Sequence, residues 1–360
     1  MTRLDPLCPL RWSGNRSDLT PHFFTLQGLL IMRKILLNLW TAVALGAMAN
    51  LVFAQTQAPW PTAKPISVVV PFPAGGAVDF AARLVANRLA DRLGQAVVID
   101  NVAGAGGVVG TTKAVRAPAD GYTLLVAPDS VIVIAPLVTP DTVKYDALKD
   151  LIPVGVINVT PLILVARPGL PVSNVAELLR YARANPGKLN YASPGVGNLL
   201  HVAMESLRQQ ASIDMVHVPY KAAPQTVTDL IGNQIDLALL VPSTGLVHIR
   251  GGKIKALGVT VEERLAAIPD VPSLSETPDL KGFHVTSSIG LFVPAKTPAA
   301  IVERLNRVLN DILASPEVRK TFEDQAAAVG KGPSAEFADF LRKELVRNAA
   351  VVKAANIRVE

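Results

Sequence analysis

One stretch of the sequence decides the fold: ISVVVPFPAGGAVDF, residues 66–80. Its apolar run, 66–70, predicts a buried strand, and the apolar residues that recur from Val78 to Leu93 predict a helix directly after it. The break between them, Pro71–Gly76 (loop A), leaves backbone N–H groups at a helix N-terminus without partners, and such groups favour an anion. The glycines allow close approach to the backbone, and the prolines fix φ. Because loop A holds no nucleophile and no base, it predicts a carboxylate receptor rather than a catalytic centre.

The residues before this stretch are predicted to lie outside the fold. Two basic residues after Met32 precede the apolar run 35–45, and small residues follow it, which is the pattern of a cleaved secretory signal. This interpretation assigns 32–54 to a signal peptide and 1–31 to a non-native N-terminal extension. The alternative is a membrane anchor over 35–53, but asparagines and small residues interrupt that run.

Composition excludes several classes of protein. The 360 residues carry a net charge of +6, which falls to +3 without residues 1–54, and the charges are interspersed. With no basic block and few aromatic residues, no nucleic-acid partner is predicted. The single cysteine, Cys8, lies in the predicted extension, so the exported part would contain no disulfide. A chain of this length can be stabilised by its hydrophobic core alone.

Short apolar runs alternate with amphipathic windows, which is typical of an α/β protein with mainly parallel sheets. A helical C-terminal part predicts a discontinuous first lobe, 60–159 and 285–360, with a second lobe, 160–284, inserted between two crossing strands. Strands are predicted at 66–70, 96–99, 123–127, 151–159, 162–166, 189–192, 214–218, 235–240 and 256–260. Helices are predicted at 78–93, 108–115, 175–185, 199–210, 225–231 and 335–355 and after Pro298 and Pro316, with N-caps at Asn174, Thr297 and Ser315.

A second glycine-rich segment, Asn101–Gly110 (loop B), is placed like a dinucleotide-binding fingerprint, between a strand and a helix. The spacing fails because Val109 stands where glycine or alanine is required, and no acidic residue ends the next strand. An NAD-dependent oxidoreductase is therefore a weak alternative, and no triad, nucleophile elbow or Walker loop supports an enzyme. We expect loop B to form a wall of a cleft, or simply to pack a helix on a sheet.

A third segment, Ser193–Asn198 (loop C), repeats the design of loop A: a strand, a glycine-rich turn and a helix N-terminus. Ser193 and Asn198 add side-chain donors, although Asn198 is equally suited to cap the helix. His201 is a further candidate on that helix, or packs on its face. No cysteine or second histidine stands at ligand spacing, so no metal is predicted. Loops A and C can face each other across a cleft.

Two further groups of residues are candidates at element ends. Tyr220 and Lys221 follow a strand, where ligands gather in open α/β sheets. We expect the Tyr220 hydroxyl to point at the ligand and Lys221 to pair with a carboxylate, with an exposed loop lysine as the alternative. Asp79, in the first turn of its helix, is expected to stabilise the helix dipole rather than act as a base.

Six ordered stretches resemble one family of receptors: Val70–Gly76 with Asp79, Gly104–Gly107, Asp120–Leu125, Pro186–Ser193, Val216–Lys221 and Pro269–Pro272. Over about 60–360 the chain is similar to the extracytoplasmic solute receptors of the tripartite tricarboxylate transporter system, the Bordetella uptake gene (Bug) family. The resemblance implies a type II periplasmic-binding-protein fold, in which two α/β lobes joined by two crossing strands close around a small carboxylated solute. It also implies a periplasmic monomer that delivers an organic acid or amino acid to a membrane permease.

By this resemblance the ligand site draws on both lobes and needs no catalytic residue, metal or cofactor. Loop A would hold one carboxylate through backbone and water contacts, and loop C would form the opposite wall. The predicted ligand-binding residues are Phe72, Pro73, Ala74, Gly75, Gly76, Asp79, Asp129, Ser130, Ser193, Gly195, Gly197, Asn198, His201, Tyr220 and Lys221.

The chain departs from the family pattern at four places: Asn198 replaces Ser or Thr, Ala222 replaces Gly, Ser288-Ile289 replaces an aromatic pair, and Pro128–Val131 replaces a Thr/Asn/Gly-rich loop. These changes remove an aromatic wall and introduce Asp129, whose charge would disfavour a second carboxylate unless it points to solvent. A monocarboxylate or an amino acid is thus predicted as readily as a dicarboxylate. A sensory receptor for a membrane kinase is the alternative to a transport receptor.

Overall fold

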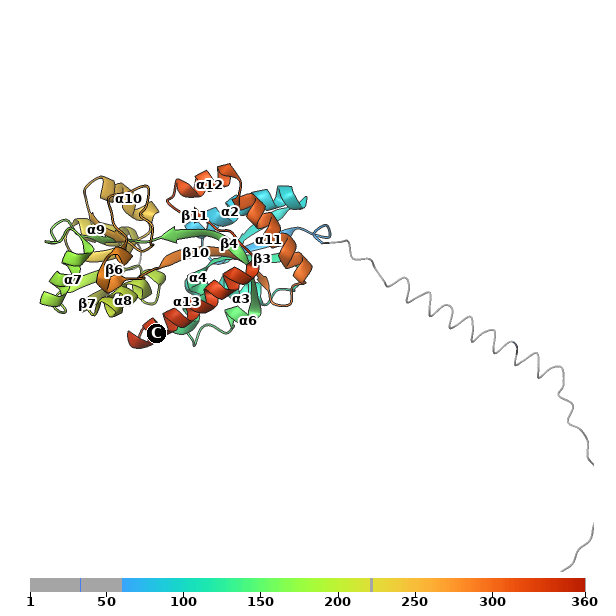
Figure 1. Ribbon diagram of the computed structural model, residues 1–360. Helices are drawn as coiled ribbons and strands as arrows, with labels where there is room; N and C mark the ends of the chain where they lie inside the picture. Colours follow the sequence, from blue (N-terminus) through green and yellow to red (C-terminus); the bar gives the residue numbers. More distant parts are fainter. Residues whose placement is uncertain (1–32, 34–59, 221–222, 360) are drawn as a thin grey trace, which may run out of the picture. The chain divides into compact units, whose positions relative to one another are not determined.

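The computed structural model describes residues 33, 60–220 and 223–359. The predicted extension and signal peptide, apart from residue 33, and the candidate Lys221 lie outside the described residues. The chain divides into Met1–Gln57 and Ala58–Glu360, and every element below belongs to the latter (Figure 1).

Within the described residues, the first lobe is built on a six-stranded sheet. Its strands are β1 (Ile66–Val70), β2 (Val97–Asn101), β3 (Thr123–Pro128), β4 (Leu151–Pro161), β10 (Thr286–Pro294) and β11 (Ala328–Val329). The order is β11-β4-β10-β3-β1-β2. β1 pairs in parallel with β2 and β3, whereas β10 runs antiparallel between β3 and β4. Loop A therefore leaves the same end of the sheet at which β3 and β4 end.

Helices cover both faces of this sheet, which is why β1 reads as an uninterrupted apolar run. Ile66, Val68 and Val70 pack on one face and Val69 on the other, in separate hydrophobic clusters. Figure 1 shows α2, α11 and α12 over the first face and α3, α4 and α13 over the second. The helices of this lobe are α2 (Ala77–Leu93), α3 (Val108–Val115), α4 (Asp129–Val133), α5 (Ala135–Val138), α6 (Ala147–Asp150), α11 (Ala299–Leu313), α12 (Pro316–Glu323) and α13 (Ser334–Ala354), with the 3-10 turn η1 (Ala105–Gly107).

The second lobe repeats this layered plan on a five-stranded sheet, as counted in the described residues. Its strands are β5 (Ile163–Ala166), β6 (Leu189–Ser193), β7 (Met215–Pro219), β8 (Leu237–Leu240) and β9 (Lys255–Val259), in the order β7-β6-β8-β5-β9. Its helices are α7 (Val175–Ala184), α8 (Leu199–Ala211), α9 (Ala223–Ile231) and α10 (Pro242–Arg250), with the 3-10 turns η2 (Leu274–Glu276) and η3 (Pro278–Leu280). Loop C leads from β6 into α8, as loop A leads from β1 into α2.

The structure corrects several details of the predicted elements. The prediction that Thr297 is an N-cap is wrong, because α11 begins after Pro298 and the Thr297 hydroxyl donates to the Pro294 carbonyl (2.7 Å). Ser315 does occupy the N-cap position of α12, but its hydroxyl donates to Ile312 instead of capping. Asn174 caps α7 as expected, accepting from the Glu177 amide. The sequence pattern missed α4, α5 and α6, since helices of four or five residues show no helical period, and it also missed the nine-residue α10.

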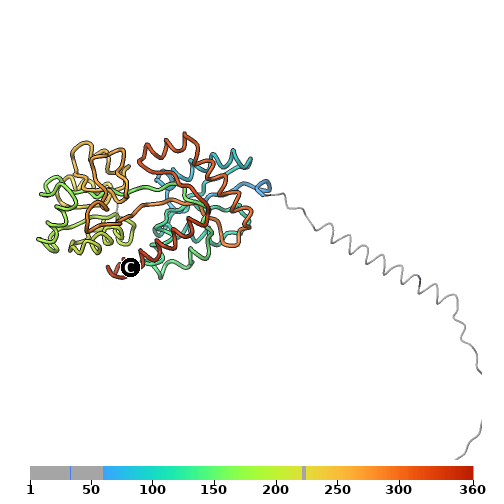
Figure 2. Tube along the Cα trace, in the orientation of Figure 1, coloured from blue at the N-terminus to red at the C-terminus, as the bar shows by residue number. Residues whose placement is uncertain are grey.

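Two segments of the chain pass between the lobes (Figure 2). One is β4, which continues through Leu162 into β5, and the other enters β10 through Val285. The fully buried Thr260 joins them, because its hydroxyl accepts from the Leu162 amide (2.9 Å) and donates to the Val285 carbonyl (2.6 Å). Backbone hydrogen bonds from Thr260 to Leu162 and from Val285 to Thr260 complete the ladder. The two crossing segments are thus fastened to each other at the hinge.

Replacing Thr260 with valine is expected to lower the free energy of unfolding by about 2 kcal/mol, because two buried backbone groups lose a side-chain partner. Urea unfolding of the purified protein would measure it. Thr260→Ser keeps the hydroxyl and is expected to lose no more than about 1 kcal/mol. Equal stability of the valine variant and the parent protein would show that the hydroxyl does not stabilise the hinge.

Candidate functional site

A hollow of about 590 Å³ lies between the lobes, within the size range of small-molecule sites. The first lobe contributes Phe72 from loop A, part of loop B and residues of α4 and α5, and the second lobe contributes loop C. We call it the interlobe hollow. It is lined by Phe72, Ala105, Gly106, Ser130, Val131, Ala135, Val138, Thr139, Thr142, Pro194, Val196, Gly197, Asn198, Leu199 and Val359.

Four of the predicted residues line this hollow: Phe72, Ser130, Gly197 and Asn198. Lys221 is not described, and the remaining predicted residues do not line the hollow: Pro73, Ala74, Gly75, Gly76, Asp79, Asp129, Ser193, Gly195, His201 and Tyr220. The structure therefore brings loops A and C to one place and divides the candidates into lining residues and residues that shape the loops.

Asp79 organises loop A from the first turn of α2. Its carboxylate accepts hydrogen bonds from the Gly75 amide (2.9 Å), from Asn101 Nδ2 (3.0 Å) and from Arg83 Nε (2.9 Å). Asn101 also donates to the Phe72 carbonyl (3.1 Å), so both ends of the loop are fixed. The hydrogen bond from Arg83 is the main cause that holds the pKa of Asp79 at about 2. The buried carboxylate thus stays charged and does more than stabilise the helix dipole.

The N-terminus of α2 is open beside this anchored loop. Its N-cap is Gly76, and among the described residues no side chain caps the helix. The residues Pro73–Gly76 are exposed, so the first-turn N–H groups can bind water or an anion. Gly75 adopts a φ of +87°, a conformation that glycine permits at no steric cost.

Loop B packs directly beneath loop A. A Cβ on Gly110 would lie 2.6 Å from the Val102 carbonyl and 2.7 Å from Pro71 Cα, so only glycine allows α3 to approach so closely. Ala105 and Gly106 meanwhile line the interlobe hollow. Each of the two expectations for loop B therefore describes one part of it. Ala105 and Gly106 form a wall of the hollow, whereas Gly110 lets α3 pack closely on the end of β1.

Loop C is held by its own side chains. Ser193 Oγ donates to the Gly195 carbonyl (2.9 Å) and lies 2.7 Å from His217 Nε2. Asn198 Nδ2 donates to the same carbonyl (2.7 Å), while its Oδ1 accepts from the His201 amide (3.0 Å). Asn198 thus caps α8 and also lines the hollow, so the two interpretations of this residue are compatible.

The Tyr220 hydroxyl lies elsewhere than expected. It donates to Asp229 Oδ2 in α9 (2.7 Å) rather than pointing into the hollow. Partial burial, followed by this carboxylate, raises the pKa of Tyr220 to about 12. A sequence pattern cannot show such pairing, because strand and helix residues meet only once the sheet is assembled.

Asp129 and Ser288, two departures from the family pattern, contact each other. The Ser288 hydroxyl (2.7 Å) and amide (3.2 Å) both donate to Asp129 Oδ2. Asp129 is buried behind Ser130, its Oδ1 has no partner among the described residues, and burial raises its pKa to about 7. The carboxylate therefore neither points to solvent nor lines the hollow, and its raised pKa weakens the expected repulsion of a second ligand carboxylate.

The residues that sequence reasoning missed come from α5, from the turn after it and from the C-terminal segment. Thr139 and Thr142 bring hydroxyls to the hollow, and Val359 closes one side, where its amide donates to the Val138 carbonyl (3.0 Å). A four-residue helix gives no periodic signal, and nothing in the sequence brings residue 359 near loop C. No described residue that lines the hollow has a charged side chain.

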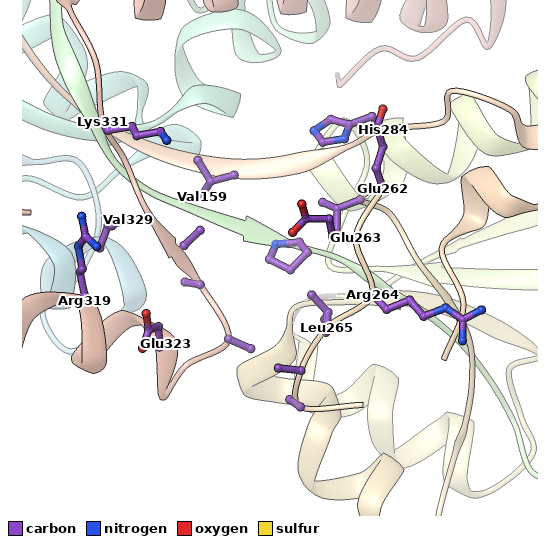
Figure 3. Close-up of a pocket in the computed structure, with 17 residues that line it drawn as sticks. Val159, Glu262, Glu263, Arg264, Leu265, His284, Arg319, Glu323, Val329 and Lys331 are labelled. Carbon is purple, nitrogen blue, oxygen red and sulfur yellow. The ribbon is translucent and has the colours of Figure 1, made fainter. Parts of the chain in front are cut away.

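A second, larger hollow of about 1010 Å³ lies between the lobes on the other flank of the crossing strands, where β11 borders β4 (Figure 3). Figure 3 shows Lys331 and Arg319 from the first lobe and Glu262 and His284 from the second. It contains none of the predicted site residues. Its lining mixes both signs of charge and lacks the paired glycine-rich loops that border the interlobe hollow.

Two further observations concern the described residues only. No cluster of three His, Cys, Asp or Glu side chains is arranged there to bind a metal ion. No helix among them combines the length and the apolar character needed to cross a bilayer.

Comparison with known proteins places these features in context. A family model for the tripartite tricarboxylate transporter family receptor matches residues 81–357. The chain is 33 % identical over 331 residues to BugT of Bordetella pertussis, covering 91 % of this chain and 99 % of BugT. It resembles the structure of Rpa4515 from R. palustris with adipate (31 % identity, TM-score 0.71, 83 % of this chain and 99 % of that one). It also resembles MatC from Rhodopseudomonas palustris with bound malate (31 %, TM-score 0.68, 81 % and 100 %), and these likenesses confirm the predicted two-lobe α/β fold.

Proposed function

Because the chain belongs to the family of tripartite tricarboxylate transporter receptors, we propose that it captures a small carboxylate between its lobes and delivers it to a membrane permease. The observation that carries this function is the interlobe hollow, in which two strand-to-helix loops from different lobes meet. Hinge closure would bury the solute between loops A and C.

The lining of the hollow favours an acid without a basic group. Asn198 and the hydroxyls of Ser130, Thr139 and Thr142 line the hollow and can donate to carboxylate oxygens, and the uncapped start of α2 follows the lining residue Phe72 by a few residues. No acidic side chain among the described lining residues would pair with the ammonium group of an amino acid. The uncapped N-terminus of α2 can receive one carboxylate, and the side-chain donors of the hollow can receive a second. We therefore propose a dicarboxylate, the class that Rpa4515 and MatC contain in their structures.

The cellular setting follows from the same family membership. We propose that residues 32–54 direct the chain to the periplasm and are removed, that 1–31 are not native, and that the mature receptor acts as a monomer. We propose that residues 60–159 and 285–360 form the first lobe and that residues 160–284 form the second. Co-purification with a permease would support the proposed permease partner, and co-purification with a membrane sensor kinase would contradict it.

A thermal-shift screen of mono-, di- and tricarboxylates and amino acids tests the proposed function. A solute that binds only the folded protein is expected to stabilise it by about 2.7 kcal/mol at a hundredfold excess over the dissociation constant. We expect the largest rise in melting temperature with four- to six-carbon dicarboxylates such as malate and adipate. No shift with any member of the panel would contradict the proposal, and a shift with NAD alone would favour the oxidoreductase.

A further inference from the structure

We propose that His201 and His217, which stack beneath loop C, are positioning residues for the solute site and hold loop C only while both rings are uncharged. This goes beyond the proposed function, and its solute readout rests on that function. The ring geometry, the hydrogen bonds and the surrounding charges each support it.

The two imidazoles form part of a column of three rings. The His201 and His217 ring centroids lie 3.7 Å apart with planes 11° from parallel, and the Tyr191 ring stacks on His217 at 5.0 Å. His201 comes from α8 and His217 from β7, and both lie next to the β6 strand that leads into loop C. The column therefore joins three elements directly under the solute-facing loop.

Each histidine makes a hydrogen bond that reaches loop C. His201 Nδ1 accepts from the Gly197 amide (3.0 Å), so this nitrogen carries no proton. Ser193 Oγ donates to the Gly195 carbonyl, so at 2.7 Å it accepts from His217 Nε2. The neutral tautomers satisfy both contacts. Gly197 lines the hollow, and a Cβ there would lie 2.9 Å from Val138 of the first lobe, so a small shift of this loop changes the cleft.

The charged side chains near the two histidine rings do little to stabilise a protonated imidazole. Glu205 in α8 is the acidic group that faces the rings, but it accepts from the Tyr191 hydroxyl (2.5 Å) and pairs with Arg208 (2.8 Å). Arg208 also pairs with Asp214 (3.4 Å). Burial lowers the pKa of His201, and burial together with the stacked His201 lowers that of His217 to about 4.

Protonation would break the arrangement in two ways. A proton on His201 Nδ1 would face the Gly197 N–H, donor against donor, and two imidazolium rings would repel each other across 3.7 Å. Because burial lowers both folded-state pKa values below the ordinary 6.5, the stabilisation is complete above about pH 6.5 and is lost as the pH falls through the folded-state pKa values, of which that of His217 is about 4. Solute affinity should fall over the same interval.

The first experiment compares side chains that keep or lose the contact, with malate as the probe in titration calorimetry at pH 7.5. His201→Leu removes the acceptor for Gly197 and is expected to raise Kd about tenfold. His201→Asn places an amide oxygen near the position of Nδ1 and is expected to stay within about threefold of the parent protein. His248→Gln, in α10 away from the column, is the matched control and should change nothing. Equal loss with leucine and asparagine would overturn the positioning role.

The second experiment uses the reciprocity of binding and protonation. If solute binding requires neutral rings, saturating malate must lower the imidazole pKa values, which NMR titration of the histidine side chains measures. At pH 4, near the pKa of His217, half of the parent molecules would be protonated and unable to bind. Between pH 7.5 and pH 4 the affinity of the parent protein should therefore fall about twofold more than the affinity of the double variant His201→Asn/His217→Gln. Ring pKa values that do not change with malate, or identical pH profiles, would refute the proposal.

Failure of the proposed function is distinguishable from failure of this inference. If no carboxylate binds at any pH, the function is wrong, but the ligand-free protein still tests the column. In that form the Gly197 amide resonance is expected to move in step with the titration of the two rings. A Gly197 resonance that stays constant through the ring titration would disprove the coupling regardless of ligand.

Discussion

Replacing Gly110 with alanine is expected to abolish solute binding at millimolar malate and to lower the free energy of unfolding by about 3 kcal/mol. The new methyl group would lie 2.6 Å from the Val102 carbonyl and 2.7 Å from Pro71 Cα. Both neighbours are backbone atoms, so α3 must move away from the sheet or loop A must shift. Since Pro71 begins loop A, either response displaces Phe72 from the wall of the hollow. Urea unfolding and titration calorimetry would measure the two effects.

The control is the same glycine-to-alanine substitution at a helix position where the new methyl group has room. A Cβ on Gly245 in α10 would meet side-chain atoms only at 3.5 Å and beyond, which is ordinary contact. Gly245→Ala is expected to leave binding unchanged and to stabilise the protein by up to about 1 kcal/mol, because alanine has the higher helix propensity. If Gly110→Ala bound malate as tightly as Gly245→Ala, the close packing of α3 on loop A would have no bearing on the site.

Replacing Asp79 with alanine is the second change with a large expected effect. It leaves the Gly75 amide, Asn101 Nδ2 and the Arg83 guanidinium without their shared acceptor. Asp79 is buried although its partner Arg83 is half exposed, and leaving the Gly75 and Asn101 donors without an acceptor is expected to lower the free energy of unfolding by about 2 kcal/mol. Because loop A loses its anchor, Kd for malate should rise at least about tenfold.

The pH dependence separates this effect from a general weakening. The pKa of Asp79 is lowered from 3.8 to about 2, so its stabilisation is present above about pH 4 and is lost as the pH falls toward 2. The stabilities of the parent protein and of Asp79→Ala should therefore converge near pH 2. Asp324→Ala, which removes an exposed pair with Lys320, should leave the stability unchanged at every pH, because solvent screens such a pair. A stability difference for Asp79→Ala that is independent of pH would contradict the carboxylate's role.

Sequence patterns predicted the parts of the site whose chemistry is local. Loops A and C each lie between a strand and a helix that are adjacent in the chain, so spacing, glycine content and cap preference identify them. Asn174 and Asn198 cap their helices through contacts three residues apart, within reach of a sequence rule.

The rest of the site depends on contacts between distant segments. Asp129 and Ser288 are 159 residues apart, and only the pairing of β10 with β3 brings them together. Val359 reaches the hollow because α13 packs across the first lobe, a result of helix packing that no local pattern contains. The expected orientation of the Tyr220 hydroxyl was wrong for the same reason, since its partner in α9 had no predicted position relative to β7.

The ladder around Thr260 has a consequence for the thermodynamics of capture. Two separate flexible connections would let the lobes twist and slide as well as close, and each such freedom would be lost on binding. Cross-linking the two segments removes most of that disorder before any solute arrives. Closing then orders few additional backbone torsions, each of which would cost about 1–2 kcal/mol. Less of the binding free energy is then spent on ordering the hinge, so more of it appears as affinity. This helps a hollow with no cationic side chain among its described lining residues to hold an anion.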